Sequence, residues 1–134
     1  MDTRVEQKGQ LPDNVIALPT TLNENFFRYW VEFLKPLHGL TEREIDVVVA
    51  FLKKRYELSK EISNSQILDK FLTGEETKRE IREECNITLA HFQVIMGKLK
   101  KNKIFIDGKI NPRFIPNVKE DKGNFQLLLF FQFK

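Results

Sequence analysis

Residues 83–105, EECNITLAHFQVIMGKLKKNKIF, decide the fold that this chain is expected to adopt. Counted at 100° per residue from Thr88, the apolar residues that follow fall within a sector of about 120°, as in a helix with one buried face. These apolar residues are Leu89, Phe92, Ile95, Met96 and Leu99. The lysines gather at the far end of the same segment. The pattern therefore predicts a helix that is buried on one side and basic at its C-terminal end.

The residues before this helix predict another helix and a tight turn. Ile81 and Cys85 stand four positions apart in EETKREIREEC, residues 75–85, and would share one buried face. Asn86 tolerates the left-handed conformation, and Ile87 can fill the corner between the two helices. Thr88 can cap the helix that follows. We therefore expect a helix, a turn and a helix over about residues 75–102.

The residues after this helix predict a β-hairpin. Asp107 and Gly108 lie between two short apolar runs, and this pair is the strongest short hairpin signal because a type I′ turn needs positive φ at both positions. Asn111 and Pro112 should end or bend the second strand, because proline cannot donate a ladder hydrogen bond. The hairpin is therefore expected within KIFIDGKINPRF, residues 103–114.

The last segment, FQLLLFFQFK at residues 125–134, predicts a closing strand. An antiparallel strand with one solvated face should alternate apolar and polar residues. Here the second face also carries apolar residues, Leu128 and Phe130, between glutamines. We therefore expect that face to be covered by the N-terminal arm or helix, or by another subunit. The first face carries Phe125, Leu127, Leu129, Phe131 and Phe133.

The N-terminal part of the chain predicts an arm and an added helix. Residues 1–20 should form an extended arm, in which NVIALP is a candidate edge segment stopped by Pro19. A helix over residues 21–35 should start at Thr21, which forms a capping box with Glu24. An aromatic stripe on this helix either packs into the core or docks onto a partner chain. The stripe consists of Phe26, Phe27, Trp30, Phe33 and Leu34.

Two further helices are expected before residue 75. Thr41 and Glu44 form a capping box that starts the first, and residues 63–74, SNSQILDKFLTG, predict a short second helix that stops at Gly74. The buried side of the first should hold Ile45, Val48, Val49, Phe51, Leu52 and Tyr56, and that of the second Ile67, Leu68, Phe71 and Leu72. The sequence thus predicts a mainly helical α+β fold with a small antiparallel sheet, forming one domain over residues 21–134.

The composition fits an intracellular globular domain. The chain has 134 residues, of which 41% are hydrophobic and 31% charged, so it can bury a core. No stretch approaches the ~20 apolar residues of a membrane span, and the polar N-terminus does not match a secretory signal. A single cysteine excludes an internal disulfide. We therefore expect a cytoplasmic protein with no membrane partner.

The charge is unevenly distributed along the chain. The net charge is +3, but residues 97–113 hold six basic residues and one acidic residue, a net +5, which leaves −2 for the remainder. A basic segment on a mildly acidic body favours a polyanion-binding surface. The alternative is a solvated helix end, because lysines favour helix C-termini in any protein.

The segment around Asn86 resembles the helix-turn-helix family in its winged form. That family's pattern is matched by an apolar pair four apart, a turn residue, an apolar plug and a Thr cap before the next helix. Here these roles fall on Ile81, Cys85, Asn86, Ile87 and Thr88, and Lys103 leads into the hairpin. The resemblance covers about residues 40–133. Two departures, Arg82 where the family has alanine and Cys85 where it has a larger aliphatic residue, imply a slightly re-angled helix pair.

The resemblance implies double-stranded DNA as the partner, with the second helix in the major groove and the hairpin as the wing. Gln93 would then pair with adenine, His91 would meet a base edge or a phosphate, and Ala90 and Val94 would touch a thymine methyl group. Phosphates would be contacted by Thr88, Lys98, Lys100, Lys101, Lys103 and Lys109. Winged-helix proteins commonly bind two half-sites as dimers, so a homodimer or other oligomer is expected. Candidate interface residues are Phe27, Trp30, Leu128 and Phe130.

Protein docking or assembly is the alternative, because a face with no arginine that contains Ala90, Val94 and Gly97 also suits a protein contact. A second resemblance lies in GKINPRFIP, which is similar to the end of winged-helix replication initiators of plasmids and phages. It favours transcription or replication control on a mobile element. In the alternative, the chain is a non-enzymatic structural protein, such as a virion component or adaptor, built on the same scaffold.

No enzymatic or metal site is expected. His38, His91 and Cys85 lie far apart in sequence and give no metal-ligand spacing, and both histidines are interpreted as surface or cap residues. There is no glycine-rich phosphate loop and no nucleophile turn. Adjacent acidic pairs on helices diverge by 100° and are interpreted as solvated. The sequence therefore predicts no catalytic residues and no cofactor.

Overall fold

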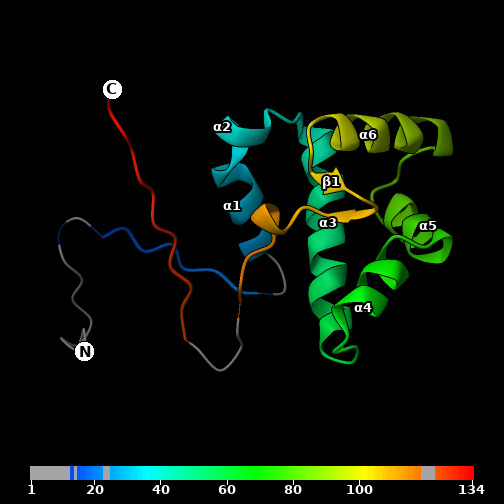
Figure 1. Ribbon diagram of the computed structural model, residues 1–134, viewed down its shortest axis with the longest axis horizontal. Helices are drawn as coiled ribbons and strands as arrows, with labels where there is room; N and C mark the ends of the chain where they lie inside the picture. The colour runs from blue at the N-terminus through cyan, green and yellow to red at the C-terminus, as the bar shows by residue number, and fades with distance from the viewer. Residues whose placement is uncertain (1–12, 14, 23–24, 119–122) are drawn as a thin grey trace.

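The computed structural model describes residues 13, 15–22, 25–118 and 123–134. Over these ranges the chain is mainly helical and carries one small antiparallel sheet, which confirms the predicted α+β class (Figure 1). The helices are α1 (Phe26–Phe33), α2 (Lys35–His38), α3 (Glu42–Ser59), α4 (Ser65–Leu72), α5 (Glu75–Glu84) and α6 (Leu89–Lys101). The strands β1 (Phe105–Ile106) and β2 (Lys109–Ile110) precede a short 3-10 helix, η1 (Pro112–Phe114).

Helix α3 runs through the centre of the molecule, with α1 and α2 on one side and α4, α5 and α6 on the other (Figure 1). It begins with the predicted capping box, since the Thr41 hydroxyl accepts from the Glu44 N–H and the Glu44 side chain accepts from the Thr41 N–H. Its predicted apolar face is confirmed as core except for Tyr56, which is only partly buried, and Ile45 and Phe51 are fully buried. The ring of Phe51 packs edge-on against Phe105 of the hairpin.

Helix α1 begins later than predicted. Its first residue is Phe26, and the Phe26 N–H donates to the Thr21 carbonyl at 3.1 Å instead of a capping side chain. The predicted start at Thr21 is therefore wrong, and Glu24 lies outside the described residues. Of the aromatic stripe, Phe33 is about half exposed where α1 ends, so the core alternative does not hold for this residue.

His38 at the end of α2 was predicted to be a surface or cap residue; it is buried, so the surface alternative is wrong, and its ring bonds backbone groups at helix ends as a cap residue does. Its Nδ1 accepts from the Leu40 N–H at 3.0 Å, and its Nε2 lies 2.8 Å from the Val31 carbonyl oxygen, to which it donates. The Asn102 side chain donates to the His38 carbonyl at 3.3 Å. The bond from Asn102 joins the end of α6 to the corner between α2 and α3, and the ring bonds of His38 tie that corner to α1.

Helix α4 buries only half of its predicted apolar face. Leu68 and Leu72 are buried against the core, whereas Ile67 and Phe71 are each more than half exposed, so their prediction as inward residues is wrong. The helix contacts α3, α5 and β2, and these neighbours cover only part of the four-residue apolar stripe. Gly74 has φ of −74° and precedes α5 as its N-cap, so it is not a left-handed helix stop.

The hairpin forms at the predicted place. Asp107 and Gly108 have φ of 52° and 76°, and β1 pairs with β2 in the register Phe105 to Ile110. Asn111 ends β2 and caps η1, since its side-chain oxygen accepts from the Arg113 N–H at 3.1 Å. The strands are short, two residues each.

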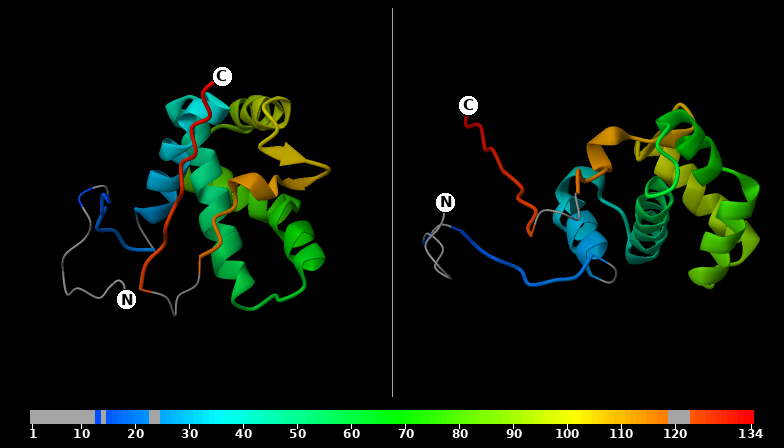
Figure 2. Two further views of the ribbon diagram at one scale, coloured as in Figure 1. Left: turned by 60° about the vertical axis from the view of Figure 1, so that its left-hand side comes forward. Right: turned by 90° about the horizontal axis from the view of Figure 1, so that it is seen from below.

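The predicted closing strand does not form. Residues 123–134 have no regular secondary structure and run alongside α1 and away from the body (Figures 1 and 2). Phe125 alone anchors them, with edge-on ring contacts to Phe26 and Trp30. Leu128 is 88% and Phe130 is 78% exposed. A strand needs a neighbouring edge for its hydrogen bonds, and a hairpin with two-residue strands offers almost none.

The N-terminal arm also forms no strand where it is described. Ile16 and Leu18 are exposed, and residues 15–20 have no regular structure. The prediction of an edge segment against the body is therefore wrong for this part of the arm. The described part of the arm therefore does not cover the second face of residues 125–134, which carries Leu128 and Phe130.

Candidate nucleic-acid interface

The turn between α5 and α6 has the predicted geometry. Asn86 has φ of 57°, and Ile87 is buried between the two helices while its N–H donates to the Arg82 carbonyl at 3.0 Å. The Thr88 hydroxyl accepts from the His91 N–H at 3.2 Å and so caps α6. Each of these roles was predicted from residue type and spacing.

Arg43 holds this turn against α3, a role that sequence reasoning missed. Its Nη2 donates to the Cys85 carbonyl at 2.7 Å, and so supplies a hydrogen bond to one of the carbonyls at the end of α5 that have no partner within the helix. Its Nη1 pairs with Asp46 at 2.9 Å, and Asp46 also pairs with Arg28 of α1. Burial lowers the pKa of the Arg28 guanidinium, but the hydrogen bonds and charges of Asp46 and Glu32 outweigh it and leave that pKa raised. The only sequence signal for this network was the three-residue spacing of Arg43 and Asp46.

Helix α6 rests on the predicted apolar seam with one exception. Phe92, Ile95, Met96 and Leu99 are all buried. Leu89 is 56% exposed, so its prediction as a core residue is wrong. It lies at the edge of the seam and lines a groove of about 550 Å³ between α5 and α6, together with Gln93.

The outward face of α6 is open to solvent on the described part of the chain. Val94 is 70% exposed, and a Cβ atom added at Gly97 would meet nothing within 4 Å. The predicted contact residues of the helix are all exposed, namely Ala90, His91, Gln93, Val94, Lys98, Lys100 and Lys101. Thr88, Lys103 and Lys109 are exposed as well.

The lysines of this region differ in their partners. Lys98 Nζ lies 3.8 Å from Glu44 Oε2, and the Glu44 side chain is largely buried because it also caps α3. Lys100, Lys101, Lys103 and Lys109 form no ion pair with any residue in the described ranges. The partner of Lys98 comes from a helix more than 40 residues earlier, so spacing within α6 gave no signal for it.

Helix α5 brings acidic residues close to this surface, but several are already paired. Arg79 forms a 2.6 Å ion pair with Glu76 and a 3.7 Å pair with Glu83, and Lys54 pairs with Glu80 at 3.2 Å. Such exposed pairs reduce the negative charge that a polyanion would meet. The basic end of α6 and the hairpin therefore remain the more favourable side for an anion.

The four predicted interface residues lie in two environments. Phe27 is buried against Tyr56, and Trp30 is partly buried with its indole N–H donating to the Phe114 carbonyl at 2.9 Å. Both side chains therefore pack within the described chain. Leu128 and Phe130 project from the C-terminal segment and are exposed.

Comparisons of the chain with protein-family models, with curated proteins and with solved structures find no match. Among the described helices, none combines the length and the apolar character that crossing a bilayer requires. The same residues contain no group of three or more His, Cys, Asp or Glu side chains arranged to hold a metal ion. Functional inference therefore depends on the geometry of α5, α6 and the hairpin.

Proposed function

We propose that the protein binds double-stranded DNA as a winged helix-turn-helix domain, with α6 as the recognition helix and the β1–β2 hairpin as the wing. The observation that carries the proposal is the exposed outward face of α6, which ends in lysines that have no ion-pair partner in the described ranges. Helix α6 has 13 residues and is therefore about 20 Å long, and a helix with its side chains is about 10–12 Å across, which suits a major groove about 12 Å wide. The role is transcription or replication control in the cytoplasm of a bacterium, on a phage or plasmid genome.

In this proposal, phosphate contacts supply most of the affinity. Lys100 and Lys101 lie at the end of α6, Lys103 lies just after it, and Lys109 lies on strand β2 of the hairpin. The N-terminal half of the outward face is uncharged and offers only His91 and Gln93 for hydrogen bonds to base edges. We therefore expect strong dependence on salt and modest preference for sequence.

The test is affinity for a fluorescently labelled random duplex at two salt concentrations. Replacing Lys100 and Lys101 by glutamine should weaken binding to every sequence and flatten the salt dependence. The matched control replaces Lys53 and Lys70, which lie on α3 and α4 and also form no ion pair in the described ranges, by glutamine. Equal loss in both variants, or no loss in either, would contradict the proposal.

Assembly is the second candidate function, and the C-terminal segment supports it. Residues 127–133 carry six exposed large apolar side chains. Within the described chain, this segment is held to the body through the ring of Phe125, which contacts Phe26 and Trp30. Such a segment suits addition to another subunit. Leu128→Ser with Phe130→Ser should lower the mass of the particle in light scattering, whereas Gln126→Ser with Gln132→Ser should not. A monomer before and after the change would exclude this function.

A further inference from the structure

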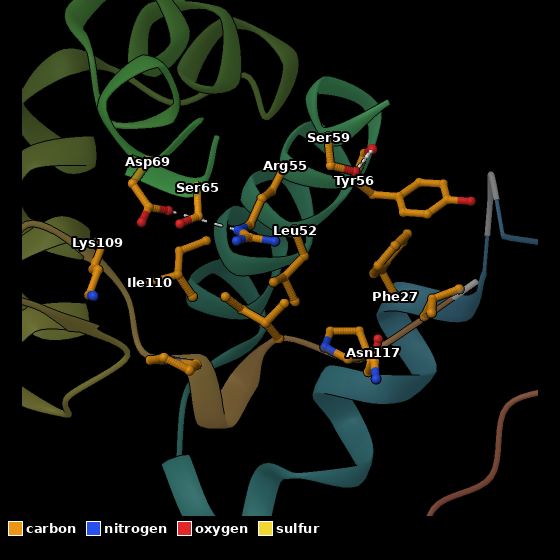
Figure 3. Close-up of a pocket in the computed structure, with 14 residues that line it drawn as sticks. Phe27, Leu52, Arg55, Tyr56, Ser59, Ser65, Asp69, Lys109, Ile110 and Asn117 are labelled. Atoms are coloured by element: carbon orange, nitrogen blue, oxygen red, sulfur yellow. Dashed lines mark hydrogen bonds and ion pairs between the residues drawn. The ribbon is translucent and has the colours of Figure 1, made fainter. Parts of the chain in front are cut away.

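A cavity of about 450 Å³ lies between α3, α4, β2 and the segment after η1 (Figure 3). This size falls in the range of sites that hold small organic molecules. Its lining comes from segments far apart in the sequence, including Phe27 of α1, Arg55 of α3 and Asn117 after η1. The cavity is separate from the outward face of α6, because no residue of α5 or α6 lines it.

Arg55 gives the cavity an unmet hydrogen-bonding group. Its Nε is buried and has no hydrogen-bond partner within the described ranges. The Asp69 carboxylate is 3.9 Å away, close enough for charge attraction but too far for a hydrogen bond. Buried donors are nearly always satisfied in proteins, so Arg55 Nε is a candidate donor to a group bound in the cavity.

The surroundings of Arg55 combine positive charge with apolar walls. Arg55 and Lys109 outnumber Asp69, so the lining carries a net +1. In Figure 3, Lys109 and Asp69 lie to one side of the Arg55 guanidinium, and the rings of Phe27 and Tyr56 lie to the other. One end of a ligand would thus meet Arg55, Lys109 and Asp69, which carry a net +1, and its other end would meet apolar side chains.

We propose that this cavity binds a small organic anion, with one carboxylate or phosphate group on an apolar body. The anionic group accepts hydrogen bonds from Arg55 Nε and one Nη, the paired geometry for which a guanidinium is suited. Lys109 adds its charge at the rim and offsets the negative charge of Asp69, whose carboxylate lies 3.9 Å from the same Nε. The apolar body packs against Phe27 and its neighbours. This proposal does not depend on DNA binding.

The test follows the Arg55 Nε–H signal in nitrogen-15 NMR spectra of the full chain. Phenylacetate and phenyl phosphate are the probes, and the stronger of the two identifies the anionic group. Benzyl alcohol supplies the ring without charge, and acetate and inorganic phosphate supply the charge without the ring. We expect saturable shifts for at least one probe, with a dissociation constant of about 1 mM or lower. The neutral and ring-free compounds should bind at least about tenfold more weakly.

Variants separate binding from folding. Arg55→Gln should abolish saturable binding, followed through backbone amide signals of the lining residues. Lys109→Gln, an exposed change at the rim, should weaken binding several-fold and leave the melting temperature unaltered. Lys53→Gln, on the same helix as Arg55 but outside the lining, is the control and should bind as the unaltered chain does. The proposal is overturned if neither probe shifts Arg55, if benzyl alcohol binds as tightly, or if Lys109→Gln binds like Lys53→Gln.

Discussion

Replacing Lys101 by glutamine is expected to remove one phosphate contact from the proposed DNA complex. The same change at Lys98 should have a smaller effect on the salt dependence of binding. The reason lies in their partners. Lys101 is exposed and forms no ion pair with the described residues, so its whole charge is available to a phosphate. Lys98 lies 3.8 Å from the Glu44 carboxylate and must give up part of that attraction before it can bind another anion.

The magnitude follows from counterion release. Each phosphate contact adds about 0.9 to the slope of log affinity against log salt concentration. Between about 50 mM and about 200 mM salt, a fourfold change, one contact accounts for a factor of about 3.5 in affinity. The ratio of the affinity at about 50 mM salt to the affinity at about 200 mM salt should therefore be about 3.5-fold smaller for Lys101→Gln than for the unaltered chain. Lys98→Gln should reduce the slope by less than about 0.5, because Glu44 already neutralises part of its charge.

Fluorescence anisotropy with one random-sequence duplex measures all of these affinities under one set of conditions. Lys70→Gln is the matched control, since Lys70 is exposed on α4 and also lacks an ion pair within the described ranges. Its slope should equal that of the unaltered chain. Thermal melting of each variant shows whether α6 remains folded, and all three exposed changes should alter stability very little.

Two results would refute this reasoning. If Lys98→Gln and Lys101→Gln flatten the slope equally, the ion pair with Glu44 does not limit Lys98 in solution. If Lys101→Gln behaves as Lys70→Gln does, the outward face of α6 is not where DNA binds. The second result would favour the assembly function, which makes no use of these lysines.

Three further predictions concern single residues near the turn and α6. Glu44→Gln keeps the capping bond but frees Lys98, so duplex affinity should rise by up to about fivefold in the same anisotropy assay. Asn86→Ala should lower the urea unfolding free energy by about 1 kcal/mol and Asn86→Gly by much less, because the φ of 57° is strained for alanine; equal losses would disprove this. Burial raises the pKa of the Cys85 thiol, so the folded state favours the neutral form. The neutral thiol therefore stabilises the fold fully at pH values below the ordinary thiol pKa, and this stabilisation is lost as the pH rises through the raised pKa. The urea unfolding free energy of the unaltered chain should decline over that alkaline range, and that of Cys85→Ser should lack this decline.

Local signals in the sequence were sufficient for the turn and the hairpin. Asn86, Asp107 and Gly108 were assigned positive φ from residue type alone, and each adopts it. The capping box of Thr41 and Glu44 depends on residues three apart and formed as expected. These features are predictable because the interactions that fix them lie within a few residues of one another.

Features that depend on the shape of the whole core could not be predicted in this way. Periodicity showed that Leu89, Ile67 and Phe71 lie beside buried residues, but the width of the buried stripe depends on how closely the neighbouring helix approaches. The closing strand failed for a related reason. Alternation along residues 125–134 describes one chain, whereas a strand also requires a partner edge, and the two-residue strands of the hairpin do not supply one.

The residues exposed on the candidate site were predicted from the sequence, but the contacts that hold α6 in place were not. The exposed residues of α6 follow from its seam, yet the orientation of that helix depends on residues from α1 and α3. Arg28 of α1 pairs with Asp46, and Asp46 pairs with Arg43, which binds the carbonyl at the end of α5. Helix α1 therefore belongs to the framework that holds the turn before α6. Any change that displaces Arg28 should alter the presentation of α6 without touching a residue on its outward face.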